Sequence, residues 1–442
     1  MNQQSDQANS DDKHKLNFKM ECLRLLSDGS GVGYVNGTAT FVQGLLPGEI
    51  GEVDVYETKK KWQRACLGSL LQPSPERCEP PCTVFKECGG CQLQHMTYQE
   101  TLYWKKQWVE DAITRIGKIS AEVQPVLGMP NPWRYRNKVR LHCAKSGELG
   151  YYQEKSKALV RFKDCLLISE RMNRCIRKTE EFLMSEYSPL DQPQALTFRE
   201  NTQQKLLLLI EGGSIQAFHS PKAQRFFEKL LSDGLCAVWW TDPKGSLRLL
   251  WGDEVFQQTI LDMTFNASPL SFLQVNSQQT NVLYLEVLTR AGLNGNEVVW
   301  DLYSGIGTLT LALARKAKKV TGIEENLGAV ADALRNAKNQ RGLGCVRFLE
   351  GKVELRIPEV DEQPDVVVLD PPRAGMHPEV VKRLIDVRPQ RIVYVSCDPG
   401  TLARDLGLLA AGGYKIDSVQ PVDMFPWTQH VETVTSLQKT DS

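Results

Sequence analysis

Hydrophobic and polar residues follow three successive patterns along this chain. Between Leu16 and Leu71, short β-prone runs alternate with glycine turns, a spacing that predicts a small β-barrel. Between Tyr98 and Ile116, the apolar residues recur at helical spacing. From Glu297 onward, a strand, a glycine turn, a helix and a second strand follow one another, as in a βαβ unit. The pattern therefore predicts a multidomain protein of the β and α/β classes.

The stretch from Trp133 to His142 alternates strictly and predicts a strand. One face of that strand would carry Arg134, Arg136, Lys138, Arg140 and His142. Aligned like charges repel one another unless a polyanion lies across them, so this face is expected to bind RNA phosphates rather than to be simply solvated. A second basic cluster, Lys59–Lys61 and Arg64 around Trp62, fits either phosphate contact with base stacking or a solvated hairpin tip.

Composition narrows the class of protein. The 442 residues include 53 Lys and Arg against 53 Asp and Glu, so any surface for nucleic acid must be local. This length suggests roughly two or three domains. The chain has no run of about eighteen apolar residues, and residues 1–15 are polar and lack an apolar signal core. We therefore expect a cytoplasmic protein with no membrane span and with a disordered tail at residues 1–15.

The twelve cysteines are many for a reducing compartment, where cysteines serve metal binding or catalysis more often than disulfides. Cys82, Cys88 and Cys91 form a compact motif. Gly89 and Gly90 within it allow the backbone to wrap closely around a bound group. The motif predicts a metal centre.

A fourth ligand for this centre must come from elsewhere in the chain. Cys165, which follows an apolar and basic strand, is the preferred candidate, with Cys143 and Cys78 as alternatives. Four thiolates can hold either an iron–sulfur cluster or a tetrahedral zinc ion. The spacing alone does not choose between the two.

Two strand ends in the C-terminal half carry candidate chemistry. Val393–Gly400 predicts a strand that runs into a sharp Ser-Cys-Asp-Pro-Gly turn. Such a junction in an α/β protein lies at the carboxyl end of the sheet, where ligands bind, so Cys397 would stand at the rim of a cleft. The alternative is that Cys397 is a small buried hydrophobic residue. The strand Val366–Asp370 runs in the same way into Pro371–Arg373.

The βαβ unit that follows Glu297 carries Asp301, a glycine turn that ends at Gly307, and Glu324 at the end of the next strand. The third glycine of a dinucleotide fingerprint is missing, because Thr310 stands there, but an acid after the second strand suits a ribose diol. Together these residues resemble the S-adenosylmethionine site of class I methyltransferases.

Taken together, the chain resembles the RNA uracil-5-methyltransferases. It is most similar to the bacterial 23S ribosomal RNA branch, which has a TRAM RNA-binding module and a four-iron four-sulfur cluster. The resemblance is carried by the cysteine motif, the Ser-Cys-Asp-Pro turn, Leu46–Glu49, Phe272–Asn276 and His430–Glu432. Two positions depart from the family pattern: Asp398 stands where Asn is common, and Cys78 is an additional cysteine.

The resemblance implies a role for each candidate residue. Cys397 would be the nucleophile and Glu432 the general base. S-adenosylmethionine would be bound by Gln274, Tyr303, Glu324 and Asp370, and the cluster by Cys82, Cys88, Cys91 and Cys165. The chemistry needs this set, because a thiolate that adds to carbon 6 of uracil moves negative charge to carbon 5, and a base must later remove the carbon 5 proton.

The implied fold is α/β and β multidomain. It comprises an OB-like TRAM β-barrel (residues 16–72), a central α+β iron–sulfur and RNA-binding domain (73–91 and 125–265), and a Rossmann-like class I methyltransferase domain (92–124 and 266–442). The expected protein is a monomer whose partner is 23S rRNA. Its cofactors would be S-adenosylmethionine and a four-iron four-sulfur cluster.

Two alternative functions stay open. A tRNA uracil-5-methyltransferase would use the same chemistry, although those relatives commonly lack the cluster cysteines and the first barrel. A catalytically idle RNA-binding or assembly protein would keep the fold alone. The intact Cys397, Glu432 and cofactor residues argue against that second alternative.

Overall fold

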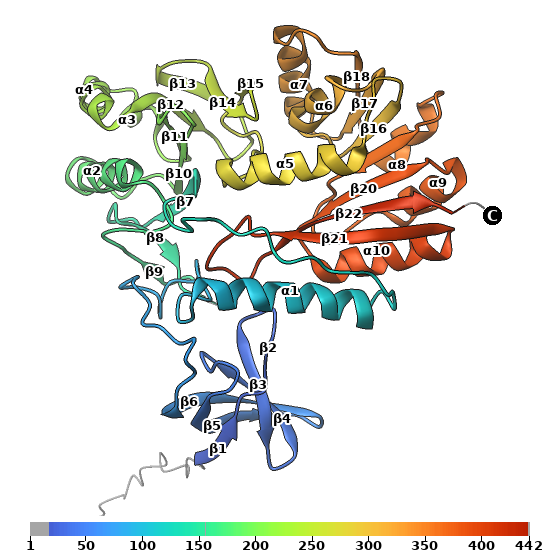
Figure 1. Ribbon diagram of the computed structural model, residues 1–442. Coiled ribbons are helices and arrows are strands. Elements are labelled where there is room, and N and C mark those ends of the chain that lie inside the picture. The colour runs from blue at the N-terminus through green and yellow to red at the C-terminus, as the bar shows by residue number, and fades with distance from the viewer. Residues whose placement is uncertain (1–16, 155, 441–442) are drawn as a thin grey trace, which may run out of the picture.

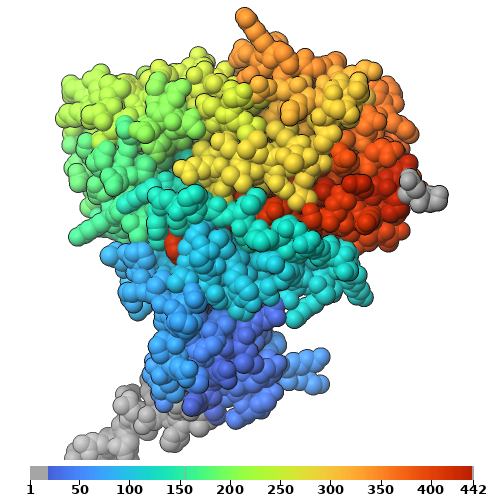
Figure 2. All heavy atoms as spheres, in the orientation of Figure 1, coloured from blue at the N-terminus to red at the C-terminus, as the bar shows by residue number. Residues whose placement is uncertain are grey.

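The computed structural model describes residues 17–154 and 156–440, so the tail expected at residues 1–15 lies outside the described residues. Figure 1 shows a small β unit at the bottom, a central part on the left and a large α/β part on the right, with α1 (Tyr98–Arg115) between the β unit and the rest. The space-filling view shows the two upper parts packed together and the N-terminal unit projecting below them (Figure 2). Among the described residues, no helix is both long and apolar enough to cross a membrane.

The N-terminal unit is a six-stranded sheet with the order β1-β5-β6-β4-β3-β2. Its strands are β1 (Asn17–Glu21), β2 (Arg24–Leu25), β3 (Ser30–Val35), β4 (Thr38–Gln43), β5 (Ile50–Thr58) and β6 (Trp62–Gln72). β3 and β4 form a hairpin through Asn36 and Gly37, whose φ angles of 50° and 76° are those that a type I′ turn requires. A core that includes Met20, Val42 and Val53 belongs to this sheet alone. The strands expected in this segment are therefore present as one sheet.

A second buried cluster attaches the N-terminal unit to α1. It consists of Leu25, Leu46, Leu93, Met96, Trp104 and Trp108. Nε1 of Trp108 donates to the carbonyl oxygen of Leu25 at 2.9 Å, and Arg24 forms an ion pair with Asp111. The unit is therefore held by buried contacts as well as by its linker.

The helix α1 forms where the apolar periodicity predicts it. Thr97 caps its first turn by accepting a backbone hydrogen bond through its side chain. Val109 and Ile113 on its apolar face enter the core of the C-terminal part, where α1 packs on α10 (Pro399–Ala411). A helix from the first third of the chain thus covers the C-terminal sheet.

The central part is built on a seven-stranded sheet with the order β13-β12-β11-β10-β7-β8-β9. Its strands are β7 (Lys138–Cys143), β8 (Leu149–Tyr152), β9 (Leu159–Val160), β10 (Ala195–Glu200), β11 (Leu206–Glu211), β12 (Leu235–Thr241) and β13 (Leu247–Gly252). Its helices are α2 (Glu170–Glu186), α3 (Ile215–Phe218), α4 (Pro221–Lys229) and a 3-10 turn, η1 (Leu230–Asp233). The first five residues of β11 are buried aliphatics, as in a strand covered on both faces.

The strand expected from Trp133 begins only at Lys138. The backbone N–H groups of Arg134 and Arg136 instead donate to carbonyl oxygens of the segment just after Cys165. The prediction of a strand is therefore wrong for residues 133–137. These residues form a loop that is hydrogen-bonded to the segment after Cys165.

The C-terminal part contains a seven-stranded sheet with the order β18-β17-β16-β19-β20-β22-β21. Its strands are β16 (Val298–Leu302), β17 (Lys319–Glu324), β18 (Cys345–Glu350), β19 (Val366–Leu369), β20 (Arg391–Ser396), β21 (Tyr414–Val422) and β22 (Glu432–Lys439). Its other elements are the hairpin β14 (Phe256–Ile260) and β15 (Met263–Ala267), the helices α5 (Ser277–Ala291), α6 (Thr308–Ala314), α7 (Leu327–Asn339), α8 (Val353–Arg356), α9 (Pro378–Val387) and α10, and a 3-10 turn, η2 (Ile357–Glu359). The strands β16 to β20 are parallel, and β22 is antiparallel to both of its neighbours.

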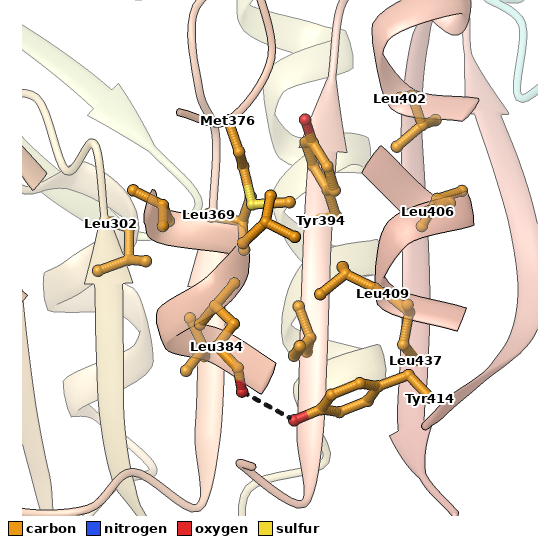
Figure 3. Close-up of a cluster of buried hydrophobic side chains, with 14 of the residues drawn as sticks. Leu302, Leu369, Met376, Leu384, Tyr394, Leu402, Leu406, Leu409, Tyr414 and Leu437 are labelled. Carbon is orange, nitrogen blue, oxygen red and sulfur yellow. Dashed lines mark hydrogen bonds between the residues drawn. The ribbon is translucent and has the colours of Figure 1, made fainter. Parts of the chain in front are cut away.

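Apolar side chains cover both faces of this sheet. Figure 3 shows one cluster, in which Leu302 and Tyr394 from the sheet meet Leu384 of α9 and Leu402 of α10. A second cluster on the other face includes residues of α5 and α6. From β16 the chain continues to β17 and β18 on one side and returns to β19 and β20 on the other, so the strand order reverses between β16 and β19. The carboxyl ends of these strands form the edge where Rossmann-like folds bind ligands.

Candidate active site

Cys397 lies in the turn between β20 and α10. Asp398 caps α10, because its Oδ1 accepts a hydrogen bond from the Thr401 N–H at 2.8 Å. Oγ of Ser396 donates to the Asp398 carbonyl oxygen at 3.1 Å and closes the turn. The cap needs only one side-chain oxygen, and Asn would supply one as well. Asp398 therefore keeps the local structure that Asn would give, and its negative charge suits a helix N-terminus.

This turn forms one wall of a cleft of about 440 Å³. The opposite walls come from α1, from the 423–431 loop between β21 and β22, and from the N-terminal unit. The lining residues include Cys397, Asp398, Arg373, Gln429, His430, Val431, Trp108, Asp111, Arg115 and Leu25–Ser27. The cleft is therefore bounded by segments that are far apart in the sequence.

Two carboxyl groups, those of the buried Glu432 and the half-buried Asp370, lie near Cys397. Glu432 is the first residue of β22, and its neighbour Thr433 pairs with Ser396 of β20. Oε2 of Glu432 has no hydrogen-bond partner in the described part of the chain. Burial, and then the charge of Asp370, raise the pKa of Glu432 to about 8. Burial likewise raises the pKa of Asp370, which follows β19. Both groups are thus able to hold a proton near neutral pH.

A cation faces these acids. Nη2 of Arg373 lies 2.8 Å from Nδ1 of His430. Burial and the positive charge of Arg373 lower the pKa of His430 to about 4, so the imidazole is neutral and accepts from the guanidinium. Burial, Glu432 and Asp370 raise the pKa of the Cys397 thiol to about 11, and Arg373 opposes them through its charge and a side-chain hydrogen bond.

No role was predicted for Arg373 or His430 from the sequence. The position of Arg373, directly after a strand end and two prolines, could have indicated a place at the ligand edge. His430 carried no separate signal beyond its place two residues before Glu432.

Three of the four expected cofactor residues, Tyr303, Glu324 and Asp370, lie at the carboxyl ends of β16, β17 and β19. Tyr303, Gly305 and Gly307 all have a positive φ, of 67°, 55° and 80°, so the backbone turns sharply after β16. The carboxylate of Glu324 accepts hydrogen bonds from the Gly305 N–H at 3.0 Å and the Asn326 N–H at 2.8 Å. The glycine turn and the acid of β17 are therefore fixed against each other.

Asp301 and Thr310 explain the missing third glycine. Oγ1 of Thr310 donates to Oδ2 of Asp301 at 2.5 Å, and both residues are buried. Burial raises the pKa of Asp301 to about 7. Thr310 thus holds Asp301 at the end of β16 by a hydrogen bond, whereas a glycine at this position would leave room for a pyrophosphate.

Gln274 lies in the segment that joins β15 to α5. Its carbonyl oxygen accepts from Nδ2 of Asn137 at 3.1 Å, and the Asn137 N–H donates to the carbonyl of Val275. At the start of the same segment, the Ser268 and Ser271 hydroxyls donate to Asp332 of α7. The segment is therefore held between the central sheet and the C-terminal part.

The four cysteines Cys82, Cys88, Cys91 and Cys165 line one cavity of about 30 Å³. The two alternative cysteines lie elsewhere: Cys78 donates to the Gln94 carbonyl and Cys143 to the Ala144 carbonyl. In residues 17–154 and 156–440, no group of three or more His, Cys, Asp or Glu side chains is arranged to hold a metal ion. The sulfurs therefore surround a space, and they do not converge on one point.

Arg136 also lines the cysteine cavity, and its buried Nε has no partner among the described residues. Three further members of the expected RNA-binding strand face have partners. Arg134 pairs with Asp164 at 2.7 Å, Arg140 pairs with Glu211 at 2.8 Å, and His142 stacks on Tyr152. The expected ladder of free cations on one strand face is therefore wrong, because two of its members are neutralised and a third points into the cavity.

Comparison with known proteins gives matches over both the catalytic segment and the whole chain. The tRNA (uracil-5-)-methyltransferase family matches residues 355–440, which include Asp370, Cys397 and Glu432. The methyltransferase small domain matches residues 262–393. An uncharacterized RNA methyltransferase of Halalkalibacterium halodurans is 39% identical over 437 residues, which cover 94% of this chain and 95% of the relative. One from Clostridium tetani is 39% identical over 449 residues and covers 96% of each chain.

Among solved structures, the Pyrococcus abyssi tRNA (uracil-54, C5)-methyltransferase in complex with S-adenosyl-L-homocysteine superposes with a TM-score of 0.74. It is 27% identical and covers 95% of this chain and 100% of its own. The strand order of the C-terminal sheet, the cleft at Cys397 and these matches lead to one assignment. The chain has a class I methyltransferase fold and belongs to the RNA uracil-5-methyltransferase family.

Proposed function

We propose that this protein transfers a methyl group from S-adenosylmethionine to carbon 5 of a uridine in RNA through a covalent Cys397–uracil adduct. The observation that carries the proposal is the meeting of three groups at one sheet edge. These are the thiol of Cys397, the buried carboxyl of Glu432 with an unpartnered oxygen among the described residues, and the guanidinium of Arg373. The target base would have to leave its stack to reach them.

The first step uses Cys397. Its thiolate adds to carbon 6 of uracil, the S–C6 bond forms, and the electrons of the C5–C6 double bond move to carbon 5 and oxygen 4 as an enolate. Arg373 lowers the pKa of the thiol against the effect of burial, so it favours the thiolate. The neutral His430 leaves the charge of Arg373 available for that task.

S-adenosylmethionine, when bound, supplies the methyl group that carbon 5 receives. The edge at the carboxyl ends of β16 and β17 fits its adenosine. Each oxygen of Glu324 accepts one backbone hydrogen bond and retains a lone pair for a ribose hydroxyl. The space beside Gly305 is open where a Cβ would lie. We assign Gln274, Tyr303, Glu324 and Asp370 to this site.

The last step uses Glu432. Its carboxylate removes the carbon 5 proton, the C5–C6 double bond re-forms, and the S–C6 bond breaks to return the thiolate of Cys397. A pKa of about 8 suits a group that must both accept and release a proton near neutral pH. The unpartnered Oε2 is the oxygen that is free to do so within the described structure.

We also propose that Cys82, Cys88, Cys91 and Cys165 hold a four-iron four-sulfur cluster, which would cross-link two distant segments. The four cysteines border one cavity, and four thiolates can hold such a cluster. The unpartnered Nε of Arg136 fits a group of net negative charge in that space.

For the RNA target, we propose 23S rRNA first and tRNA as the second candidate. The cysteine motif and the N-terminal unit, which we assign as a TRAM module, favour the ribosomal branch that the chain resembles. The Pyrococcus abyssi tRNA enzyme covers 95% of this chain, so the N-terminal unit by itself does not separate the two targets.

The experiment is to map 5-methyluridine in 23S rRNA and in tRNA from a strain that lacks this gene. The strain is then complemented with the wild-type protein or with Cys397→Ala. Loss of one 23S methylation that only the wild-type protein restores would support the proposal. Loss confined to tRNA would establish the second candidate, and unchanged methylation in both RNAs would refute the proposed function.

A further inference from the structure

The 423–431 loop is bound directly to the cysteine motif. The N–H groups of Gln92 and Leu93 donate to the carbonyl oxygen of Trp427 at 3.0 and 3.1 Å. Nε2 of Gln92 donates to the Gly89 carbonyl at 2.9 Å, and its Oε1 accepts from the Gln429 N–H at 3.4 Å. Gln92, the residue after Cys91, thus joins the wrapped cysteine segment to the loop that borders the cleft.

Trp427 sits in a conformation that its surroundings must enforce. Its φ of 67° is in the left-handed region, which a bulky side chain rarely adopts. The ring stacks on Trp133 with 4.4 Å between ring centroids, and Nε1 donates to the Pro132 carbonyl at 3.0 Å. The side chain is only 6% exposed and belongs to the cluster against which Cys91 and Cys165 pack. The cysteine site therefore holds the middle of this loop.

The far end of the same loop reaches the reacting thiol. Gln429, His430 and Val431 line the cleft together with Cys397. His430 accepts from Arg373, and Arg373 lines the same cleft as Cys397 and lowers the pKa of its thiol. A set of contacts therefore runs from the cysteine motif through Gln92 and the loop to Arg373, which lies in the same cleft as Cys397.

We propose that the four-cysteine segment positions the His430–Arg373 pair beside Cys397, with Gln92 as the positioning residue that connects them. The inference rests on the proposed function, because it concerns activation of the same thiol. It gives the cysteine site a part in the first chemical step in addition to holding the fold.

Several other charges also act on Cys397 and stay unchanged when Gln92 is replaced. Glu432 begins β22, Asp370 follows β19 and Asp398 lies in the same turn, while Asp111 and Arg115 of α1 line the same cleft. If the His430–Arg373 pair were loosened, Arg373 would counteract less of the rise that Glu432 and Asp370 cause in the pKa of the Cys397 thiol. The thiolate of Cys397 would then form only at higher pH.

The test uses RNA that carries 5-fluorouridine at the target position, because fluorine cannot leave as a proton and the adduct persists. The rate of covalent adduct formation is measured against pH on denaturing gels, with the full chain and S-adenosylmethionine. Gln92→Leu keeps the side-chain volume and removes both polar contacts; Gln92→Ala is the second variant if the first does not fold. The matched control is Gln203→Leu, at an exposed turn of the central sheet.

We expect Gln92→Leu to slow adduct formation near neutral pH by about fivefold, the effect of losing the hydrogen bond to the Gln429 N–H, and to shift the acid limb of the profile to higher pH. In a His430→Ala background, Gln92→Leu should add no further effect, because the two residues act through the same pair. A profile that superimposes on wild type, or effects that multiply in the double variant, would overturn the inference. Absence of any adduct in the wild-type protein would instead refute the proposed function.

Discussion

Lys105 of α1 and Asp423 at the start of the 423–431 loop form an ion pair of 2.5 Å, and neither side chain is exposed. The Tyr98 hydroxyl donates to the second oxygen of Asp423 at 2.7 Å, and Lys105 also donates to the Phe425 carbonyl at 3.0 Å. The charge pair therefore has further hydrogen-bond partners on both sides, from two distant segments. It fixes α1 against the loop that carries His430.

Replacing Lys105 by Met should destabilise the protein severely, by about 3–5 kcal/mol, because the carboxylate of Asp423 would remain buried without its cation. Urea unfolding followed by circular dichroism measures the loss. Lys106→Met is the control: its pair with Glu110 is partly exposed, and we expect a loss of at most about 0.5 kcal/mol. Equal effects of the two variants would contradict the role of the buried pair.

Cys397→Ala should abolish both turnover and covalent attachment to RNA, since the adduct is formed by its sulfur. Glu432→Gln should still allow addition and methyl transfer but should stall elimination, so methylated RNA should remain attached to the protein on a denaturing gel. Robust turnover by Cys397→Ala would remove covalent catalysis. Normal turnover by Glu432→Gln without accumulated adduct would assign the base to another group, with Asp370 or a water as the candidates.

The stability of the free protein should depend on pH through Glu432. Burial raises its pKa from 4.5 to about 8, so the folded state binds this proton more tightly than the unfolded chain. Its contribution is therefore fully present below pH 4.5 and is lost as the pH rises through about 8. Glu432→Gln cannot ionise, so its Tm relative to wild type should be higher at alkaline pH than at pH 4.5. A difference between the two proteins that is constant across that range would contradict the raised pKa.

The cysteine site should bind iron. Anaerobically purified protein is expected to be brown, with about four irons per chain. Cys165→Ser should lose most of that iron, whereas Cys143→Ser should keep it, because only the first of the two lines the cavity. Metal analysis and the visible absorption spectrum measure the outcome. A colourless protein with one zinc would refute the cluster.

The salt dependence of RNA binding should be determined by the cations that have no acidic partner in the described structure. Lys60 and Lys61 lie in the exposed β5–β6 hairpin. Replacing both by Ala should reduce the slope of log affinity against log salt concentration. The slope should fall in magnitude by about one for each phosphate that the protein no longer neutralises. Arg140→Ala should change the slope little, because Glu211 already neutralises Arg140. A larger change from Arg140→Ala than from the lysine pair would place the RNA on the central sheet.

Several features could be predicted from the sequence because they depend on neighbouring residues. The helical spacing of apolar residues gave α1, and the Ser-Cys-Asp-Pro-Gly turn gave the strand end that exposes Cys397. The short spacing of Cys82, Cys88 and Cys91 gave three residues of one site. In each case the chain itself limits how far apart the groups can lie.

The cationic stretch from Arg134 to His142 shows where local pattern fails. Alternation predicted one strand face, but hydrogen bonding to the segment after Cys165 turned the first residues into a loop. Arg136 then entered the cysteine cavity, and Arg140 met Glu211 on another strand. The alternating pattern showed which residues of this stretch are charged. It did not show which residues they contact, because those contacts depend on how the strands pair.

The sequence by itself determined the candidate groups: a thiol and a carboxylate at two strand ends, a glycine turn with an acid after the next strand, and a cysteine motif. Only the tertiary structure decided that Cys165 and not Cys143 lines one cavity with the motif, and that Arg373 meets His430 beside Cys397. The physical reason is that these residues lie far apart in the chain. Sheet register and the packing of loops bring such residues together, and no local spacing records that proximity.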